Sequence, residues 1–238
     1  MCSAVSEGGP IARLWRYPVK SMLGEVCEVL KLDARGVVGD RLYAVRDAAG
    51  KFGSGKSTRR FRRIDGLFRF SAAYAGDVPC ITFPDGRAMA GDDPRIHAEL
   101  SSALGQPVTL AREAGVSHLD AGPVHVLTTA YLAWLRERLP SASIDERRFR
   151  PNVLIDVPGA AQAERLWVGR TLAIGGVRLR VHELTERCVM VGMAQSDLAD
   201  DPRVLQSIAD ESGLDFGVYA EVVVPGPIAR HDRVTLLD

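Results

Sequence analysis

The chain has 238 residues, of which 30 are Lys or Arg and 30 are Asp or Glu, so its formal net charge is zero. A neutral chain lacks the overall positive charge that would attract nucleic acid or an anionic membrane surface, so any basic function must be local. No apolar run approaches the roughly 20 residues that a membrane-spanning helix needs. Neither nucleic acid nor a membrane is therefore expected as a partner.

The cysteines and histidines point to an intracellular protein without a structural metal site. The four cysteines (Cys2, Cys27, Cys80 and Cys188) lie far apart without CxxC or iron–sulfur spacing, which fits a reducing cytosol better than a disulfide framework. The five histidines are equally scattered, so no structural zinc site is expected. Residues 1–9 lack both the charged start and the apolar core of a signal peptide, and we expect them to form a disordered leader.

The first half of the chain predicts short strands and one helix. Residues 11–19 form the first candidate strand, which Pro18 interrupts because proline cannot donate to a ladder. Further strands are expected at residues 24–32, 41–47, 67–74, 80–83 and 108–111. The helix is expected at residues 94–104, because Pro94 lies in its first turn and Gly105 follows it as a stop signal.

The second half predicts a similar mixture after the polar stretch at residues 113–122. Strands are expected at residues 124–127, 153–157, 172–174, 177–184, 218–224 and 233–237. Thr128 or Thr129 can cap a helix that Pro140 ends, and a last helix is expected at residues 202–212. The strands are not separated by regular helical crossovers, which favours an α+β fold that is mainly β, with barrel-like sheets.

Cys188 follows the strand-like run 177–184 and stands next to Arg187. A neighbouring cation lowers the pKa of a thiol and favours the thiolate, which is the form that attacks electrophiles and binds metals. A free cysteine is, however, more often a small buried hydrophobic residue. The other motifs of the chain must decide between these two interpretations.

Residues 50–57, Gly-Lys-Phe-Gly-Ser-Gly-Lys-Ser, satisfy the Walker A expression letter for letter. That loop must follow a buried strand and open a helix, whereas Gly50 lies in a predicted hairpin turn and residues 58–63 are too polar for a buried helix. No apolar run ending in Asp offers a Walker B partner. We therefore reject nucleotide hydrolysis, although Lys56 and Arg59 remain candidates for contact with an anion.

Arginines at 59, 60, 62 and 63 surround Phe61, a combination that can grip phosphates and stack bases of RNA. The neutral overall charge and the absence of an RNP-like or zinc-knuckle pattern favour a solvated face or a local anion site instead.

Residues 147–152, Arg-Arg-Phe-Arg-Pro-Asn, are more informative. Arginine forks match phosphate in a bidentate manner, and the amide of Asn152 offers a donor and an acceptor to the edge of a heterocycle. The segment continues directly into the apolar residues 153–155. At least one of these arginines is therefore expected near buried structure, where it needs an anionic partner.

Five short motifs together resemble the MOSC family, the molybdenum cofactor sulfurase C-terminal domain proteins, with the N-terminal β-barrel region that precedes many MOSC domains. The motifs lie at residues 17–21 (YPVKS), 36–41 (GVVGDR), 127–130 (LTTA), 148–152 (RFRPN) and 187–189 (RCV). The resemblance extends from about residue 11 to residue 237, and amidoxime-reducing proteins are the most similar members. It implies a MOSC-type β-barrel at residues 113–238 after an N-terminal β-barrel region at residues 10–112, with a few flanking helices.

The resemblance also implies a molybdenum cofactor (Mo-molybdopterin) and the residues that hold it. Cys188 matches the cysteine that ligates the metal, and a soft thiolate suits a sulfur-rich metal site. Lys20, Ser21 and Arg41 match residues expected at the terminal phosphate of the cofactor. The pterin is expected near Arg148, Arg150, Asn152 and Arg187, with backbone donors added by the helix start at Thr128 and Thr129.

Two departures from the family pattern concern the surroundings of the metal. Reductase members usually follow the cysteine with threonines and an Asp-Pro-x-Thr-Gly turn, whereas this chain has Val-Met-Val-Gly-Met-Ala-Gln at residues 189–195. Relatives often carry a Thr-Ala-Arg-Gln-like stretch where this chain has Gly-Ser-Gly-Lys-Ser at residues 53–57. The proton donors and the range of substrates are expected to differ accordingly.

The leading hypothesis is a molybdenum cofactor-dependent oxidoreductase that reduces N-hydroxylated or N-oxygenated small molecules. The chain carries no cysteine set for an iron–sulfur cluster, so a separate redox donor such as a ferredoxin or flavoprotein is expected. One alternative is a sulfurtransferase that carries a persulfide on Cys188. Another is a non-catalytic protein that binds the cofactor.

Overall fold

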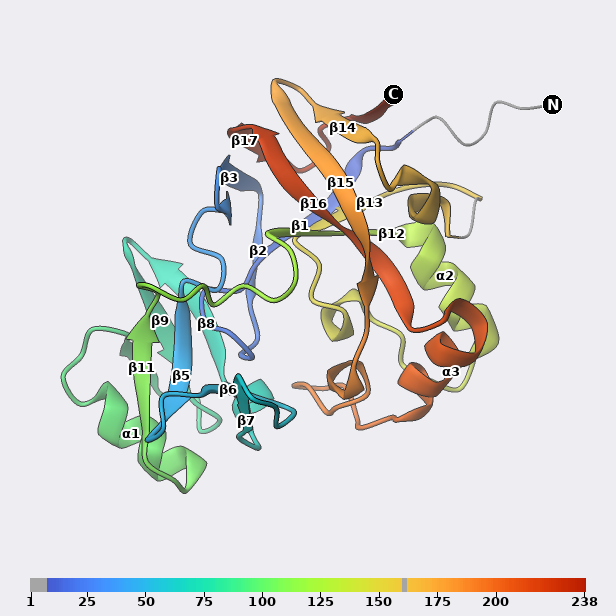
Figure 1. Ribbon diagram of the computed structural model, residues 1–238. Coiled ribbons are helices and arrows are strands. Elements are labelled where there is room, and N and C mark those ends of the chain that lie inside the picture. Colours follow the sequence, from blue (N-terminus) through green and yellow to red (C-terminus); the bar gives the residue numbers. More distant parts are fainter. Residues whose placement is uncertain (1–7, 160–161) are drawn as a thin grey trace.

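The computed structural model describes residues 8–159 and 162–238, which form two β-rich lobes (Figure 1). Most of the predicted leader, residues 1–7, lies outside the described residues. Gly8 and Gly9 are buried, and the carbonyl of Gly9 accepts a hydrogen bond of 2.9 Å from the amide of Val234. These two glycines therefore already belong to the packed fold.

The larger lobe, which we call the C-terminal lobe, is built on one eight-stranded sheet. In spatial order its strands are β18 (Val234–Leu237), β14 (Thr171–Ile174), β15 (Val177–Glu186), β16 (Asp215–Val224), β12 (Val124–Thr128), β13 (Val153–Ile155), β1 (Ile11–Arg16) and β2 (Glu25–Cys27). All neighbouring strands are antiparallel except β12 and β13. A single bridge between Pro10 and Arg233 brings the start of β1 to β18, so the sheet curls toward a barrel.

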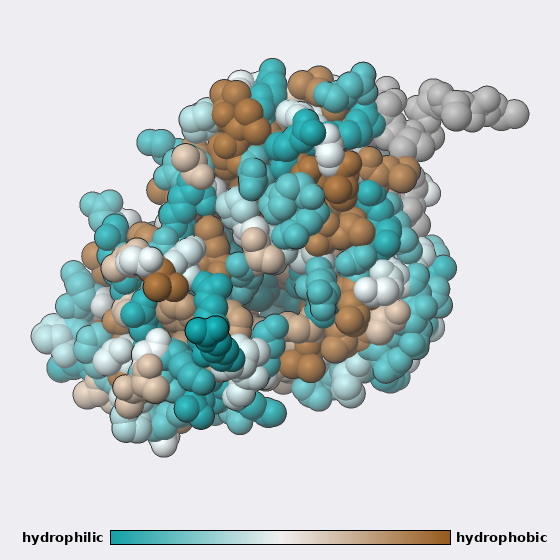
Figure 2. All heavy atoms as spheres, in the orientation of Figure 1, coloured by the Kyte–Doolittle hydropathy of each residue, from teal (hydrophilic) through white to brown (hydrophobic). Residues whose placement is uncertain are grey.

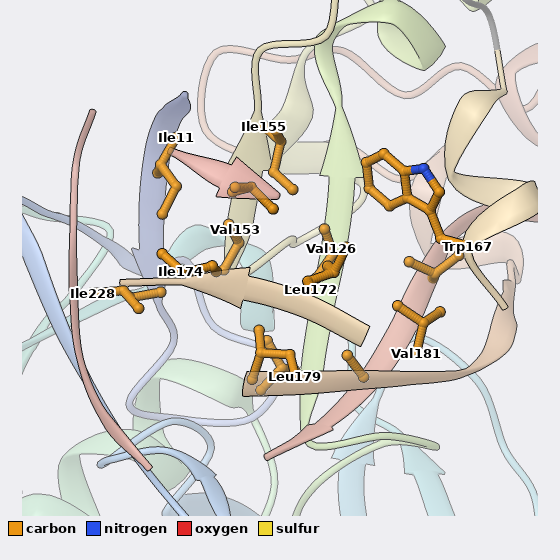
Figure 3. Close-up of a cluster of buried hydrophobic side chains, with 14 of the residues drawn as sticks. Ile11, Val126, Val153, Ile155, Trp167, Leu172, Ile174, Leu179, Val181 and Ile228 are labelled. Atoms are coloured by element: carbon orange, nitrogen blue, oxygen red, sulfur yellow. The ribbon is translucent and has the colours of Figure 1, made fainter. Parts of the chain in front are cut away.

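The interior of this curl holds the main hydrophobic core. Figure 3 shows Val126, Val153 and Leu179 pointing toward one another from three strands, with Trp167 beside them. A small sheet of β17 (Gly226–Ala229), β3 (Val29–Asp33) and β4 (Gly36–Val37) packs against the same core. Because β-branched and aliphatic side chains alternate inward along each strand, the sheet must bend around them to remove them from water.

The smaller lobe, the N-terminal lobe, contains two short sheets and a separate core. One sheet is formed by β11 (Val108–Arg112), β5 (Tyr43–Asp47), β6 (Phe52–Ser54) and β7 (Phe61–Arg63), and the other by β10 (Ala88–Ala90), β9 (Val78–Thr82) and β8 (Ser71–Ala75). Helix α1 (Ile96–Leu104) packs on β11 and ends at Gly105, whose positive φ of 68° suits glycine. Val19 and Met22 cross from β1 into this core and connect the lobes.

Two further α-helices and four 3₁₀ turns complete the described chain. Helices α2 (Thr129–Arg138) and α3 (Arg203–Ser212) cover the C-terminal lobe on one side (Figure 1). The 3₁₀ turns are η1 (Leu67–Arg69), η2 (Glu146–Arg148), η3 (Ala163–Trp167) and η4 (Val189–Val191). None of the helices within residues 8–159 and 162–238 has the length and apolarity to cross a membrane.

The prediction of an α+β fold that is mainly β is confirmed, and all three predicted helices are present. The strand predicted at residues 67–74 is partly wrong, because its first residues form η1 and only Ser71–Ala75 is a strand. Strands β1 to β4 precede the predicted boundary near residue 112 in the chain, and they pair within the sheets of the C-terminal lobe. The Walker A expression falls on a turn and strand β6, which leads to strand β7 rather than to a helix.

Candidate cofactor-binding pocket

A pocket of about 330 Å³ lies between the two lobes. In the space-filling view the surface is hollowed between the lobes, with hydrophilic residues around the hollow (Figure 2). Six cationic residues line the pocket, against two acidic ones, Asp120 and Glu186. The cationic residues are Arg41, Lys56, Arg60, Arg148, Arg150 and Arg187. This excess of positive charge favours an anionic ligand.

Backbone hydrogen bonds bring the first two sequence motifs together beneath the pocket. The amide of Tyr17 donates to a carboxylate oxygen of Asp40 over 2.7 Å, and the amide of Arg41 donates to the carbonyl of Tyr17 over 2.6 Å. Two to three residues further along both segments, the amide of Lys20 donates to the carbonyl of Tyr43 over 2.8 Å. Pro18, which has no amide hydrogen, supplies only its carbonyl to this pairing.

Cys188 is the thiol of the pocket. It follows strand β15 and begins the 3₁₀ turn η4, and its side chain is half-buried at the pocket wall. Within the described part of the chain Cys188 forms no disulfide. A half-exposed thiol at the end of a strand is available to a metal or to an electrophile.

Arg187 precedes Cys188 and turns its guanidinium group into the pocket. One terminal nitrogen donates to the carbonyl of Phe149 over 2.7 Å, and the group lies 5.7 Å from the centre of the Phe149 ring. Its buried Nε has no hydrogen-bond partner among the described residues. Burial lowers the pKa of Arg187 from its ordinary value, and an anion would oppose that effect.

Arg150 is a buried cation of the pocket. Its Nη1 donates to the carbonyl of Met22 over 2.6 Å, and its guanidinium stacks 4.2 Å from the centre of the Tyr17 ring. Its buried Nη2 finds no partner in residues 8–159 or 162–238. Burial, and next the neighbouring charge of Arg41, lower the pKa of Arg150 to about 10. An unpaired buried donor on a repelled cation is what an anionic ligand would satisfy.

Arg41 reaches the same region from the other side. Its guanidinium is paired with the fully buried Asp40, and its Nη2 donates to the carbonyl of Arg150 over 3.4 Å. Burial opposes its charge, but Asp40 and then Asp120 raise the pKa of Arg41 above its ordinary value. Arg41 therefore stays charged and helps to hold Arg150 in place.

Lys20 and Ser21 have different positions. Ser21 lines the pocket, and its hydroxyl donates to the carbonyl of Gly53 over 3.1 Å. Lys20 lies behind the wall, where its ammonium group donates to the carbonyl of His118 over 2.9 Å and pairs with Asp120. Asp120 faces the pocket. Burial alone would raise the pKa of its carboxyl group, but the charges of Lys20 and then Arg41 outweigh burial and hold this pKa below the usual range.

Three residues of the pocket have a left-handed backbone without being glycine. The φ angles are 63° at Ser21, 49° at Arg41 and 56° at Arg150. Each such residue costs about 1–3 kcal/mol unless the surrounding structure holds it. Their concentration at one pocket marks it as the place where the fold accepts strain to orient side chains.

Arg148 lines the pocket but uses its guanidinium to hold the chain after Cys188. Its nitrogens donate to the carbonyls of Ser143 over 2.8 Å, Met193 over 3.2 Å and Ala199 over 2.7 Å. Burial lowers its pKa from the ordinary value. Arg148 is therefore a positioning residue for the segment that begins at Cys188.

The structure does not bring Asn152 or Thr129 to the pocket, although the family resemblance implied that both would contact the cofactor. The carboxamide of Asn152 accepts from the amide of His125 over 3.0 Å and donates to the carbonyl of Trp15 over 3.3 Å, which joins three strands. The hydroxyl of Thr129 donates to Asp156 over 2.8 Å. The backbone amide of Thr128 donates its hydrogen bond to the carboxylate of Glu164. We therefore leave these residues out of the candidate binding set.

Several lining residues were not among the predicted site residues. Arg60, Phe61, Asp120, His125, Glu186 and Tyr219 contribute to the wall together with Lys56. Two sequence signals pointed to part of this set: the rejected Walker segment marked Lys56 as a candidate anion contact, and the arginine run around Phe61 suggested a local anion site. His125 and Tyr219 lie on paired strands β12 and β16, but nothing in a single sequence shows that these strands are neighbours.

His125 is buried at the floor of the pocket, and its Nε2 makes no hydrogen bond within the described residues. Burial, and then the charge of Arg187, hold its pKa well below the ordinary value, so the ring is neutral. Burial likewise raises the pKa of the neighbouring Tyr219 to about 12. Both rings therefore stay uncharged across the physiological range and can offer hydrogen bonds to a polar ligand.

The fold and the pocket together define a mainly β protein whose two lobes enclose a cationic cavity with one thiol. Two family models match the chain in succession: the MOSC N-terminal beta barrel domain over residues 8–101 and the MOSC domain over residues 97–235. The second match covers more than half of the chain, so the protein belongs to the MOSC family. MOSC domains are associated with the molybdenum cofactor.

Individual relatives are distant in sequence. The chain is 24% identical over 288 aligned positions to mitochondrial amidoxime-reducing component 1 of Mus musculus, covering 98% of this chain and 84% of the relative. Its fold is similar to that of the YUAD protein from Bacillus subtilis, with a TM-score of 0.50, 14% identity, and coverage of 96% of this chain and 94% of the other. A second crystal structure, of a hypothetical protein, also has a TM-score of 0.50 at 10% identity, covering 98% of this chain and 69% of the other.

Proposed function

We propose that the protein is a molybdenum cofactor-dependent oxidoreductase that reduces N-hydroxylated or N-oxygenated small molecules. The carrying observation is the pocket itself, where cations from both lobes surround the single thiol of Cys188. The similarity to an amidoxime-reducing component supports the substrate class. The overall reaction would be R–NHOH + 2 e⁻ + 2 H⁺ → R–NH₂ + H₂O, which requires an electron donor.

The donor set of the pocket fits a phosphate-bearing cofactor whose metal is mainly ligated by the cofactor's own sulfurs. Among the described residues there is no group of three or more His, Cys, Asp or Glu side chains that could hold a metal. A single thiolate is then the appropriate protein contribution, because a soft ligand completes a sulfur-rich site. The nitrogens of Arg150 and Arg187 that have no partner among the described residues would be the corresponding donors for the anionic and polar parts of the cofactor.

The residues of the chain would have separate tasks. Cys188 would ligate the metal, Ser21 and Arg41 would contact the phosphate, and Arg150 and Arg187 would bind the pterin. Lys20 would hold Asp120 in position from behind the pocket wall, and Arg148 would keep the segment after Cys188 in place. When bound, the cofactor would supply the two-electron redox chemistry. A ferredoxin or flavoprotein would deliver the electrons.

The anchoring role of Cys188 is tested by the metal content of protein produced in cells with an intact cofactor pathway. We expect near-stoichiometric molybdenum in the wild type and at least a tenfold lower content in Cys188→Ala. Cys80→Ala, at a half-buried cysteine on β9 of the N-terminal lobe, is the matched control and should keep the metal. Equal molybdenum in Cys188→Ala and the wild type would remove Cys188 from the metal site.

The reaction itself is tested with the metal-loaded protein, a chemically reduced viologen dye as electron source, and hydroxylamine and benzamidoxime as substrates. We expect formation of ammonia and benzamidine with consumption of two electrons per product. Loaded protein that turns over neither compound would contradict the reductase proposal and leave a cofactor-binding role.

A sulfurtransferase function is the second candidate, because the thiol of Cys188 is half-exposed beside the guanidinium of Arg187. A nearby cation stabilises both a thiolate and a persulfide anion. The mass of freshly isolated protein distinguishes the two functions. An increase of about 32 Da, one sulfur atom, on Cys188 without molybdenum would favour sulfur transfer.

A further inference from the structure

A second pocket of about 230 Å³ lies beside the first and shares Ser21 and Met190 with it. One wall comes from the N-terminal lobe, around the 3₁₀ turn η1, and the other from the segment that follows Cys188. The two pockets therefore adjoin at Met190, two residues beyond the thiol. A molecule that extends past Met190 from Cys188 would enter the second pocket.

The chemical character of the second pocket is opposite to that of the first. Ile64, Leu67 and Phe68 form its inner wall and are each at least 95% buried. Its two charged residues, Arg69 and Asp200, are both exposed and lie at the rim. An apolar cavity next to a cationic one favours a ligand that places its apolar end in the apolar cavity and its polar end in the cationic one.

Two methionines form the adjustable part of the wall. Met190 accepts a hydrogen bond of 3.5 Å from the hydroxyl of Ser54, which places its sulfur beside strand β6. Met193 packs over Gly55, where a Cβ atom would stand 2.4 Å from the Met193 sulfur and 3.0 Å from Cγ of Met190. Gly55 therefore lets the thioethers reach the N-terminal lobe, and thioethers adapt to apolar groups of different shapes.

We propose that the second pocket binds the apolar aryl or alkyl body of the substrate, while the polar N–O group of the same molecule enters the first pocket toward Cys188. This inference rests on the proposed reductase function and adds to it the shape of the substrate. Met193 and Gly55 set the size of the body that fits. Substrates without an apolar body bind only in the first pocket.

The test uses Ala194→Phe, because Ala194 lines the second pocket and a benzyl group there would narrow it. Ala98→Phe is the matched control, since Ala98 is an exposed residue of helix α1 that lines neither pocket. With metal-loaded protein we expect Ala194→Phe to lower the ratio of kcat/KM for benzamidoxime to kcat/KM for hydroxylamine at least tenfold. Ala98→Phe should leave this ratio unchanged. An equal ratio in the two variants would overturn the proposed subsite.

A second measurement does not depend on turnover. Saturation-transfer NMR of benzamidoxime with cofactor-free protein should show transfer to the aromatic protons in the wild type and Ala98→Phe, and its loss in Ala194→Phe. Transfer that persists in Ala194→Phe would overturn the subsite even if the enzyme is an active reductase. Transfer that is lost in Ala194→Phe, in a protein that reduces neither compound, would support the subsite and contradict the reductase function.

Discussion

Glu164 is a carboxyl group with no exposed surface, enclosed between η3 and the start of α2. It accepts hydrogen bonds from the amide of Thr128 over 3.2 Å and from the hydroxyl of Thr128 over 2.8 Å. Burial nevertheless raises its pKa to about 7, because these hydrogen bonds, together with its own backbone amide, only partly offset the loss of hydration. Thr128, which caps α2 with the same hydroxyl, thus depends on a group that titrates near neutral pH.

This raised pKa makes the free energy of unfolding depend on pH. Below pH 4.5 the carboxyl group of Glu164 is protonated in both the folded and the unfolded chain, so it does not change the free energy of unfolding. Between pH 4.5 and about 7 only the unfolded chain releases the proton. The free energy of unfolding therefore falls as pH rises through that window, by at most about 1.4 kcal/mol per pH unit. Glu164→Gln removes the fall. We expect the difference in the free energy of unfolding, variant minus wild type, to be about 3 kcal/mol larger at pH 8 than at pH 4.

Urea unfolding at pH 4, 6 and 8 checks this difference. The exposed Glu221→Gln on β16 is the control and should follow the wild-type curve. A constant difference between Glu164→Gln and the wild type at all three pH values would contradict the raised pKa.

At the scale of elements, the segment after Cys188 is held largely by the side chain of Arg148. Lysine at this position would keep the charge but lose the planar fork that serves four carbonyls, three of them in this segment. We expect Arg148→Lys to lower the free energy of unfolding by about 2–4 kcal/mol, because buried carbonyls lose their donors. Amide hydrogen exchange in residues 190–199 should accelerate more than in the rest of the C-terminal lobe.

Arg203→Lys is the control for this prediction, since the side chain of Arg203 is 56% exposed and pairs with Asp201 at the surface. It should change the free energy of unfolding by less than about 1 kcal/mol. Uniform acceleration of exchange across the protein in Arg148→Lys would show a general loss of stability and no specific hold on this segment.

The elements that could be predicted from the sequence are those with local signals. Gly105 ends α1 and Thr128 caps α2, and both features depend on residues that are adjacent in the chain. Strand β6 was missed because its three residues, 52–54, include a glycine and a serine and are too few to show a strand pattern. The place of β1 in the sheet was also hidden, since β1 pairs with β13, more than 130 residues away, and a single sequence does not reveal such pairings.

The candidate site shows the same limit. Ser21, Arg41, Arg148, Arg150, Arg187 and Cys188 line one pocket, as the motifs suggested by their resemblance to a family. Asn152 and Thr129 belong to the same motifs but serve the backbone of neighbouring strands, a distinction that residue type alone does not make. Asp120 lies in the polar stretch that marked a domain boundary, yet it pairs with Lys20 across 100 positions of the chain.

At the scale of the whole molecule, the pocket joins the lobes through charge. Arg60 and Lys56 come from the N-terminal lobe, while Arg150 and Arg187 come from the C-terminal lobe, and the cations are not balanced by the two acids that line the pocket. Like charges at close range oppose the approach of the lobes. A multivalent anion bound in the pocket would therefore stabilise the contact between the two lobes.

Thermal unfolding of cofactor-free protein with and without inorganic pyrophosphate tests this coupling, with sodium chloride matching the ionic strength. An anion at a hundred times its Kd would add about 2.7 kcal/mol to the free energy of unfolding, which corresponds to a rise in Tm of several degrees for a chain of this size. Arg150→Gln, which removes the enclosed guanidinium with the unpaired nitrogen, should lose most of that rise. Arg230→Gln, at an exposed arginine beside Glu28, should keep it. The same rise in both variants would mean that pyrophosphate binds to the protein surface in general. The cations of the pocket would then not bind the anion jointly from both lobes.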